Sequence, residues 1–175
     1  MVEGGMDPRL AEEVVAAIYG VSRRLVGMEV RSAVGPGENY MSRIFRLRCI
    51  FRSTTTGGEE VETLVAKQLW QQQDEANRIK VTIAREAEFF RKENQIYTEV
   101  LPAMEEILRS TGDDEDVGWA KLMLSLPKER LLVFEDLADC GYSMVQRSRG
   151  LDLQHALIAA MQLARWAPRE GDMLV

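Results

Sequence analysis

Lys67 is the residue of this chain whose type and position most clearly predict chemistry. It lies in a predicted strand, roughly residues 61–70, whose alternation places Val61, Thr63, Val65, Lys67 and Leu69 on one face. Burying an ammonium group beside apolar neighbours costs several kcal/mol unless an acid or a phosphate compensates it. The pattern therefore predicts an anionic partner for Lys67, and the alternative is a lysine at a strand edge with its tip in water.

A helical segment, roughly residues 78–110, carries the acids that can serve as this partner. Glu86 and Glu93 recur there at helical spacing, so both lie on one face of the helix. An ion pair between a strand lysine and a helix glutamate is the arrangement that directs an ammonium group toward the phosphates of a nucleotide. We expect Glu93 to be the partner and keep Glu86 as the alternative. Pro102 removes a backbone donor, so we expect it to bend or break the helix.

A glycine-containing turn precedes the second predicted strand. Gly35 and Gly37 flank Pro36, and a residue without a Cβ lets the backbone approach a phosphate closely. Asn39 and Tyr40 follow and are placed to cover a bound nucleotide. The motif is weak by itself, because a Gly-x-Gly tip is usually a plain hairpin, and Pro36 has no amide to donate. Asn39 equally fits the role of a turn cap.

A short apolar strand, residues 131–134, ends in two acids, Glu135 and Asp136. A solvated acidic turn is one explanation. The other is a hinge whose backbone meets the edge of an adenine, with Phe134 at the back of the pocket; the backbone then matters more than the carboxylates. The turn, the ion pair and the hinge together give ten predicted nucleotide-binding residues: Gly35, Gly37, Asn39, Tyr40, Lys67, Glu93, Phe134, Glu135, Asp136 and Leu137. No catalytic residue and no metal ligand is predicted.

Composition argues against several other kinds of function. The net charge of −6, with 28 acids against 22 bases, disfavours a nucleic-acid binder. Cys49 and Cys140 are far apart, which predicts free thiols, and His155 is the one histidine, which gives hydrolase schemes almost no support. The acidic run 113–116 lacks the spaced ligands of a calcium loop. With neither a signal peptide nor a run of about 20 apolar residues, we expect a cytoplasmic protein without a membrane partner.

Secondary-structure signals indicate the elements that would position these residues. Asp7 and Pro8 start a helix, whose predicted apolar face is formed by Leu10, Val14, Ala17 and Ile18. Strands are expected at residues 26–34, 40–52, 61–70, 119–126 and 131–134. In the second of these, Phe45, Leu47, Cys49 and Phe51 alternate with Arg46, Arg48, Ile50 and Arg52, which predicts one inward and one mostly wet face. A last helix begins after Gly150.

Together these elements predict an α+β fold: a five-stranded, mainly antiparallel sheet of the protein-kinase-like small-lobe type, with an N-terminal helix, a helix that carries Glu93, and a C-terminal linker helix. We expect an N-terminal helix at residues 1–24, the small lobe at 25–137, and a post-hinge segment that begins a second lobe at 138–175. The linker helix has a wide apolar stripe, formed by Leu153, Ala156, Leu157, Ala160, Leu163, Ala164 and Ala167.

The order of these motifs resembles the ecdysteroid kinase-like (CHK kinase-like) family of insects and nematodes, relatives of choline kinase and aminoglycoside phosphotransferases. The resemblance covers roughly residues 8–166 and rests on residues 38–42, 65–67, 93–102, 133–137, 141–142 and 150–153. It implies an ATP-dependent small-molecule kinase lineage that acts on ecdysteroids or other hydroxylated metabolites. By the same resemblance Lys67 contacts phosphate, Glu93 is its helix partner, and residues 135–137 form the hinge facing adenine.

The chain also departs from that family. Relatives continue from the linker helix into a large lobe with an HGD-type catalytic loop, whereas here Trp166-Ala167-Pro168-Arg169 stands at the junction. We therefore expect a truncated small lobe that binds ATP weakly and does not transfer phosphate alone, with Mg²⁺ needed only in a full-length relative. The alternatives are an interaction protein that docks on a full-length kinase or another protein through the 152–167 helix, and a splice or gene-model fragment without a function of its own.

Overall fold

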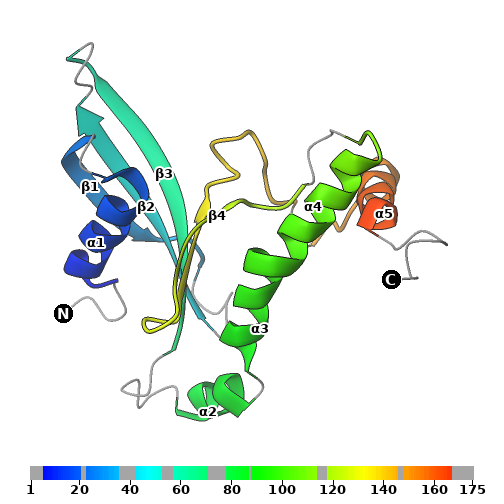
Figure 1. The fold of residues 1–175 in the computed structure, drawn as a ribbon, viewed down its shortest axis with the longest axis horizontal. Helices are drawn as coiled ribbons and strands as arrows, with labels where there is room; N and C mark the ends of the chain where they lie inside the picture. Colours follow the sequence, from blue (N-terminus) through cyan, green and yellow to red (C-terminus); the bar gives the residue numbers. More distant parts are fainter. Residues whose placement is uncertain are drawn as a thin grey trace.

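The computed structural model describes residues 6–20, 23–35, 42–52, 57–70, 78–86, 88–113, 118–145 and 148–166 (Figure 1). Its elements, in chain order, are α1 (Pro8–Tyr19), β1 (Arg24–Ser32), β2 (Ser42–Arg52), β3 (Glu59–Leu69), α2 (Arg78–Glu86), α3 (Phe89–Gln95), the π-helical segment η3 (Ile96–Val100), α4 (Leu101–Ser110), β4 (Leu122–Leu126), β5 (Leu131–Glu135) and α5 (Leu153–Trp166). No helix among the described residues is long and apolar enough to cross a membrane.

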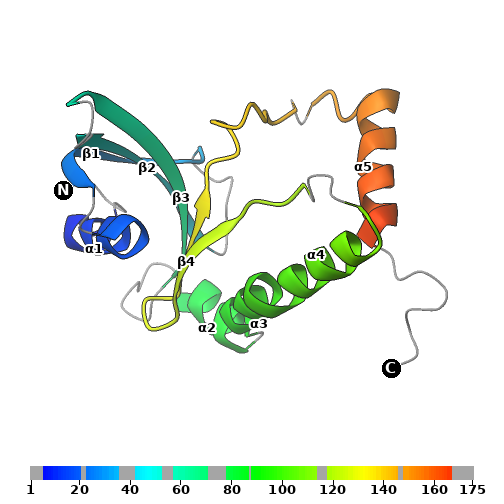
Figure 2. The same ribbon diagram turned by 45° about the horizontal axis from the view of Figure 1, so that its top comes forward.

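The strands form one antiparallel sheet in the order β1-β2-β3-β5-β4. This confirms the predicted α+β fold with its five-stranded antiparallel sheet, and the arrangement is consistent with a kinase-like small lobe. Figures 1 and 2 show α1 on one side of the sheet and the continuous α3-η3-α4 helix on the other. The sheet is therefore the middle of three layers, and its two faces have different environments.

The core lies between α1 and the sheet. The alternation predicted for β2 is confirmed, because Phe45, Leu47, Cys49 and Phe51 are each at most 3% exposed and point to this side. Below them, β3 and β5 contribute further buried residues: Leu64, Ala66, Leu131 and Val133. Burying such apolar side chains is the main source of folding free energy.

Helix α1 starts as predicted, since Asp7 Oδ1 accepts a hydrogen bond from Arg9 N–H at 2.9 Å and Pro8 occupies the first turn. Its buried residues, however, are Ala11, Val14 and Val15, whereas Ala17 is exposed. The prediction that Ala17 belongs to the apolar face was wrong. The centre of the buried face of α1 is shifted by about one residue from the predicted face. At 3.6 residues per turn, this shift rotates Ala17 toward water.

The long second helix is interrupted at a different place from the one predicted. Glu88 adopts a left-handed conformation (φ 53°) between α2 and α3, while the chain continues as a helix through Pro102. Just before the proline, Leu101 N–H donates to the carbonyl oxygen of Ile96, five residues earlier. A π-type turn widens the helix locally. We infer that this widening makes room for the ring of Pro102, which would otherwise clash with the backbone carbonyl one turn earlier. The helix is therefore not broken at Pro102, where we expected either a bend or a break.

Helix α5 stands apart from the sheet, next to the C-terminal end of α4 in both views (Figures 1 and 2). Its fixed point is Arg165, whose Nη2 and Nε lie 2.6 Å and 3.0 Å from the two carboxylate oxygens of Asp113. This bidentate pair joins the last turn of α5 to the segment that follows α4.

Candidate functional site

Lys67 and Glu93 form the predicted ion pair, with Lys67 Nζ 2.5 Å from Glu93 Oε1. The two side chains are 30% and 26% exposed, so the pair is not in the core. It lies on the face of the sheet opposite α1, which we call the open side. Glu86, the alternative partner, has a side chain outside the described part of the structure. Lys67 also lies on the less buried face of β3, where its neighbours Val61 and Thr63 are exposed and partly buried, respectively.

Two further contacts hold α3 and η3 against the sheet beside this pair. The ring of Tyr97 packs on that of Phe134, with centroids 4.7 Å apart, and Ser125 Oγ donates to Asn94 Oδ1 at 2.5 Å. Burial, and to a smaller extent the charge of Glu93, raises the pKa of Tyr97, so its hydroxyl stays protonated at neutral pH. Glu93 is thus presented to Lys67 by a helix that is held against the sheet at Asn94 and Tyr97, just after Glu93, and such fixing favours a well-placed ammonium group.

The hinge predicted after β5 is a compact turn. Glu135 N–H donates to the carbonyl oxygen of Lys121, and the Glu135 carboxylate accepts the Lys121 N–H at 2.7 Å, so this residue is tied to the β4 side. The Leu137 carbonyl accepts hydrogen bonds from Cys140 and Tyr142. The Leu137 N–H, in contrast, makes no hydrogen bond with another described residue. A donor of this kind at the end of a central strand can meet an acceptor on the edge of a flat ligand.

The turn between β1 and β2 is described only in part. Gly35 is within the described residues, whereas Gly37, Asn39 and Tyr40 lie outside them. The strand register still locates the turn, because Ala33 N–H donates to the Ile44 carbonyl and Ile44 pairs with Lys67. Ala33 and Ile44, which flank this turn, therefore lie at the same end of the sheet as Lys67.

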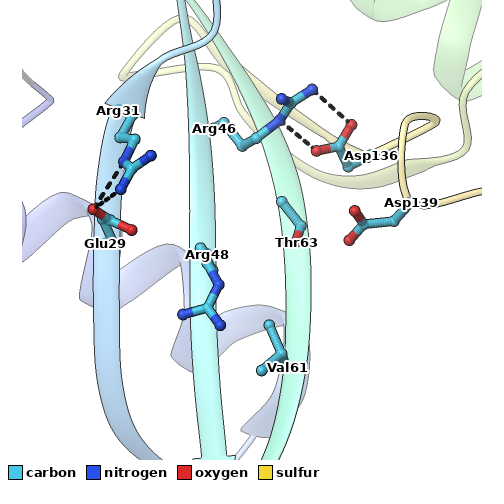
Figure 3. Close-up of a pocket in the computed structure, with 8 residues that line it drawn as sticks. All are labelled: Glu29, Arg31, Arg46, Arg48, Val61, Thr63, Asp136 and Asp139. Carbon is cyan, nitrogen blue, oxygen red and sulfur yellow. Dashed lines mark hydrogen bonds and ion pairs between the residues drawn. The ribbon is translucent and has the colours of Figure 1, made fainter. Parts of the chain in front are cut away.

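A cavity of about 430 Å³ lies farther along the same face (Figure 3). Of the predicted nucleotide-binding residues that the structure describes, only Asp136 lines it; Lys67, Glu93 and Phe134 do not. The alternation of β2 predicts a mostly solvent-exposed face that carries its arginines, and it gives no signal that Arg46 lies 2.5 Å from Asp136 Oδ2. The lining residues are Glu29, Arg31, Arg46, Arg48, Val61, Thr63, Asp136 and Asp139.

Comparisons with known proteins bear on these observations. A search of curated proteins found no match, and neither did a search of solved structures. A model of the ecdysteroid kinase-like family matches residues 36–168, which is more than half of the chain and includes Lys67, Glu93 and the hinge. The match confirms the resemblance on which the sequence motifs were interpreted. The chain belongs to the ecdysteroid kinase-like family.

Proposed function

We propose that the Lys67 face of the sheet binds the nucleotide of a kinase-like phosphotransferase. Family membership suggests such a function, together with a general use of ATP and Mg²⁺. The observation that supports nucleotide binding by this chain is the ion pair of Lys67 and Glu93, which holds a partly buried ammonium group in a fixed orientation. The acceptor that we propose is a hydroxylated small molecule, an ecdysteroid or a similar metabolite.

The residues present fit the two ends of ATP. Lys67 Nζ has three donors and Glu93 takes one, so two remain for phosphate oxygens. The Leu137 N–H offers one hydrogen bond to the base. Phe134, near the end of β5, packs against Tyr97. When bound, ATP supplies the phosphoryl group that is transferred. The described residues contain no group of three or more His, Cys, Asp or Glu that could hold a metal ion, so we derive no step through Mg²⁺.

Calorimetric titration of the full chain with ATP tests this proposal. Lys67→Met removes the ammonium group but keeps the length of the side chain, and we expect it to weaken binding at least about tenfold, as for the loss of a charge-assisted hydrogen bond. Lys92→Met, an exposed lysine one residue from Glu93 on α3, is the matched control and should bind like the wild type. The proposal is wrong if the wild type does not bind ATP at millimolar concentration, or if both variants bind equally.

A second candidate function is association through α5. Five large apolar side chains of this helix are 54% to 75% exposed, and they are Leu153, Leu157, Ile158, Met161 and Leu163. Exposed apolar surface on this scale marks interaction sites on globular proteins. The helix contains no Asp or Glu, and its one arginine is engaged by Asp113, so no charge on it selects a charged partner or repels an identical helix. We therefore propose a second copy of this chain as the occupant.

Sedimentation velocity over a range of protein concentrations tests this association. Leu157→Glu combined with Leu163→Glu puts charge on the exposed apolar surface and should shift the chain to the monomer. Gln154→Glu introduces the same charge at an exposed polar position of α5 and should leave the association unchanged. A wild-type chain that stays monomeric at the highest concentration would exclude the second copy as the occupant.

A further inference from the structure

Arg46 and Asp136 form an ion pair that spans the middle of the sheet. Arg46 belongs to β2 and Asp136 follows β5, and β3 lies between these two strands. Two strand spacings separate their backbones by about 10 Å, a distance that an extended arginine side chain can bridge. Arg46 Nη2 donates a hydrogen bond to Asp136 Oδ1 at 3.1 Å, and Nε lies 2.5 Å from Oδ2, so both carboxylate oxygens face the guanidinium (Figure 3).

Asp136 is the more demanding partner of this pair. Its side chain is 3% exposed, whereas that of Arg46 is 45% exposed. A buried carboxylate is strongly unfavourable without a cation and further hydrogen bonds. Arg46 is the one cation that the described structure places on it. The guanidinium thus reaches from the open side of the sheet to a carboxylate that would otherwise be buried alone.

The same carboxylate organises the hinge. Asp136 Oδ1 accepts the Ala138 N–H at 3.1 Å, and the Asp136 carbonyl accepts the Asp139 N–H at 3.0 Å. A carboxylate that receives a backbone N–H two residues later fixes the start of a turn. Leu137 lies inside this turn, so the direction of its free N–H follows from the position of Asp136. Whatever holds Asp136 therefore aims the Leu137 N–H.

Arg46 differs in this respect from its neighbours on the same face. Arg31 pairs with Glu29 of its own strand, with Nη2 2.6 Å from Oε1. Arg48 lines the same cavity but forms no ion pair with a described residue. Of these three arginines, Arg46 alone connects the β2 strand to the hinge (Figure 3).

We propose that Arg46 is a positioning residue, which holds Asp136 and thereby fixes the hinge in the conformation that presents the Leu137 N–H to the base of a nucleotide. The part of this inference that concerns the base rests on the proposed nucleotide site. Asp136 acts through the turn and does not itself contact the base, because both of its carboxylate oxygens face Arg46. The pair preorganises a binding site that would otherwise be ordered only when the ligand arrives.

Amide hydrogen exchange on the full chain without ligand tests the positioning role directly. Arg46→Gln should lower the protection of the hinge amides of residues 138, 140 and 142 at least about tenfold, while the amides of β5, which pairs with a strand on each side, keep theirs. Arg48→Gln is the matched control and should change neither set. Replacing both partners, Arg46→Gln with Asp136→Asn, removes the buried lone charge and should restore part of the protection.

Calorimetric titration with ATP supplies the second arm. Arg46→Gln should raise the Kd several-fold without a matching loss of protection in β5, and the double variant should recover part of the affinity. Unchanged hinge protection in Arg46→Gln overturns the inference, as does equal loss throughout the sheet, which would indicate a purely structural pair. Lost hinge protection with an unchanged Kd overturns the role in binding. A wild type that does not bind ATP overturns the proposed function instead, and the exchange data still decide whether Arg46 orders the hinge.

Discussion

Helices α1 and α5 carry similar apolar stripes and have opposite surroundings. In α1, Ala11, Val14 and Val15 are at most 2% exposed, because the apolar faces of β2, β3 and β5 lie against them. In α5, Leu153 and Met161 are 75% and 68% exposed, and the contact that joins the helix to the rest is polar. Periodicity thus predicts that a helix has an apolar face, but it does not say what covers that face. Helix α1 therefore belongs to the hydrophobic core, whereas the apolar face of α5 is exposed on the surface.

The largest difference between the two helices should appear when each receives a charge. Val14→Asp places a carboxylate at a fully buried position of α1, and we expect it to lower the free energy of unfolding by at least about 3 kcal/mol. Leu157→Asp makes a comparable change at a position of α5 that is 54% exposed, and we expect less than about 0.5 kcal/mol. Urea denaturation followed by circular dichroism measures both. Equal effects would show that α5 contributes to the core as α1 does.

The two cysteines extend the comparison to the closed and open sides of the sheet. Cys49 lies in the core under α1, where burial raises the pKa of its thiol to about 11, whereas Cys140 is exposed in the turn after β5. At pH 8 we therefore expect a thiol reagent to modify Cys140 and to leave Cys49 intact until the chain unfolds. Modification of both thiols in the folded protein, detected by mass spectrometry, would contradict the closed core.

The same shift predicts how stability depends on pH. Below pH 9 the Cys49 thiol is protonated in both states, so it causes no loss of stability. Between its ordinary pKa of 9.0 and the folded value of about 11, the unfolded chain releases the proton first, and stability falls by roughly 2 to 3 kcal/mol. Tyr19, whose pKa is raised to about 12 by burial, extends the fall in the same direction. Cys49→Ala should flatten the slope between pH 9 and 11, and an unchanged slope would assign it to other groups.

How far the sequence predicts this structure differs between elements for physical reasons. The strands of the sheet were predictable from the local alternation of apolar and polar residues. The pairing of Lys67 with Glu93 was predictable because a lysine is rare among apolar residues of a strand and a glutamate follows on the next helix. The pair of Arg46 and Asp136 was not, because it joins residues 90 positions apart across an intervening strand. The π-type turn before Pro102 also left no signal, since sequence patterns indicate where a proline disturbs a helix and not how the backbone adapts.

Among these predictions, substitution of Lys67 should have one of the smallest effects on stability. Its side chain is 30% exposed, which is between the exposures of the apolar residues of α1 and of α5. Its ion pair is partly exposed, so water screens much of the attraction, and we expect Lys67→Met to change the free energy of unfolding by about 1 kcal/mol or less. Lys67→Met combined with Glu93→Gln leaves no unpaired charge and should be closer still to the wild type.

Urea denaturation of the same protein samples used for ATP titration separates the two roles of Lys67. A binding residue loses affinity at least about tenfold while the variant remains folded, because its ammonium group is held for a ligand and contributes little to the core. Lys92→Met again serves as the control, since it removes an exposed charge from the same helix that carries Glu93. A loss of several kcal/mol in Lys67→Met would mean that this side of the sheet is as closed as the side under α1, and its lysine would then be a structural residue.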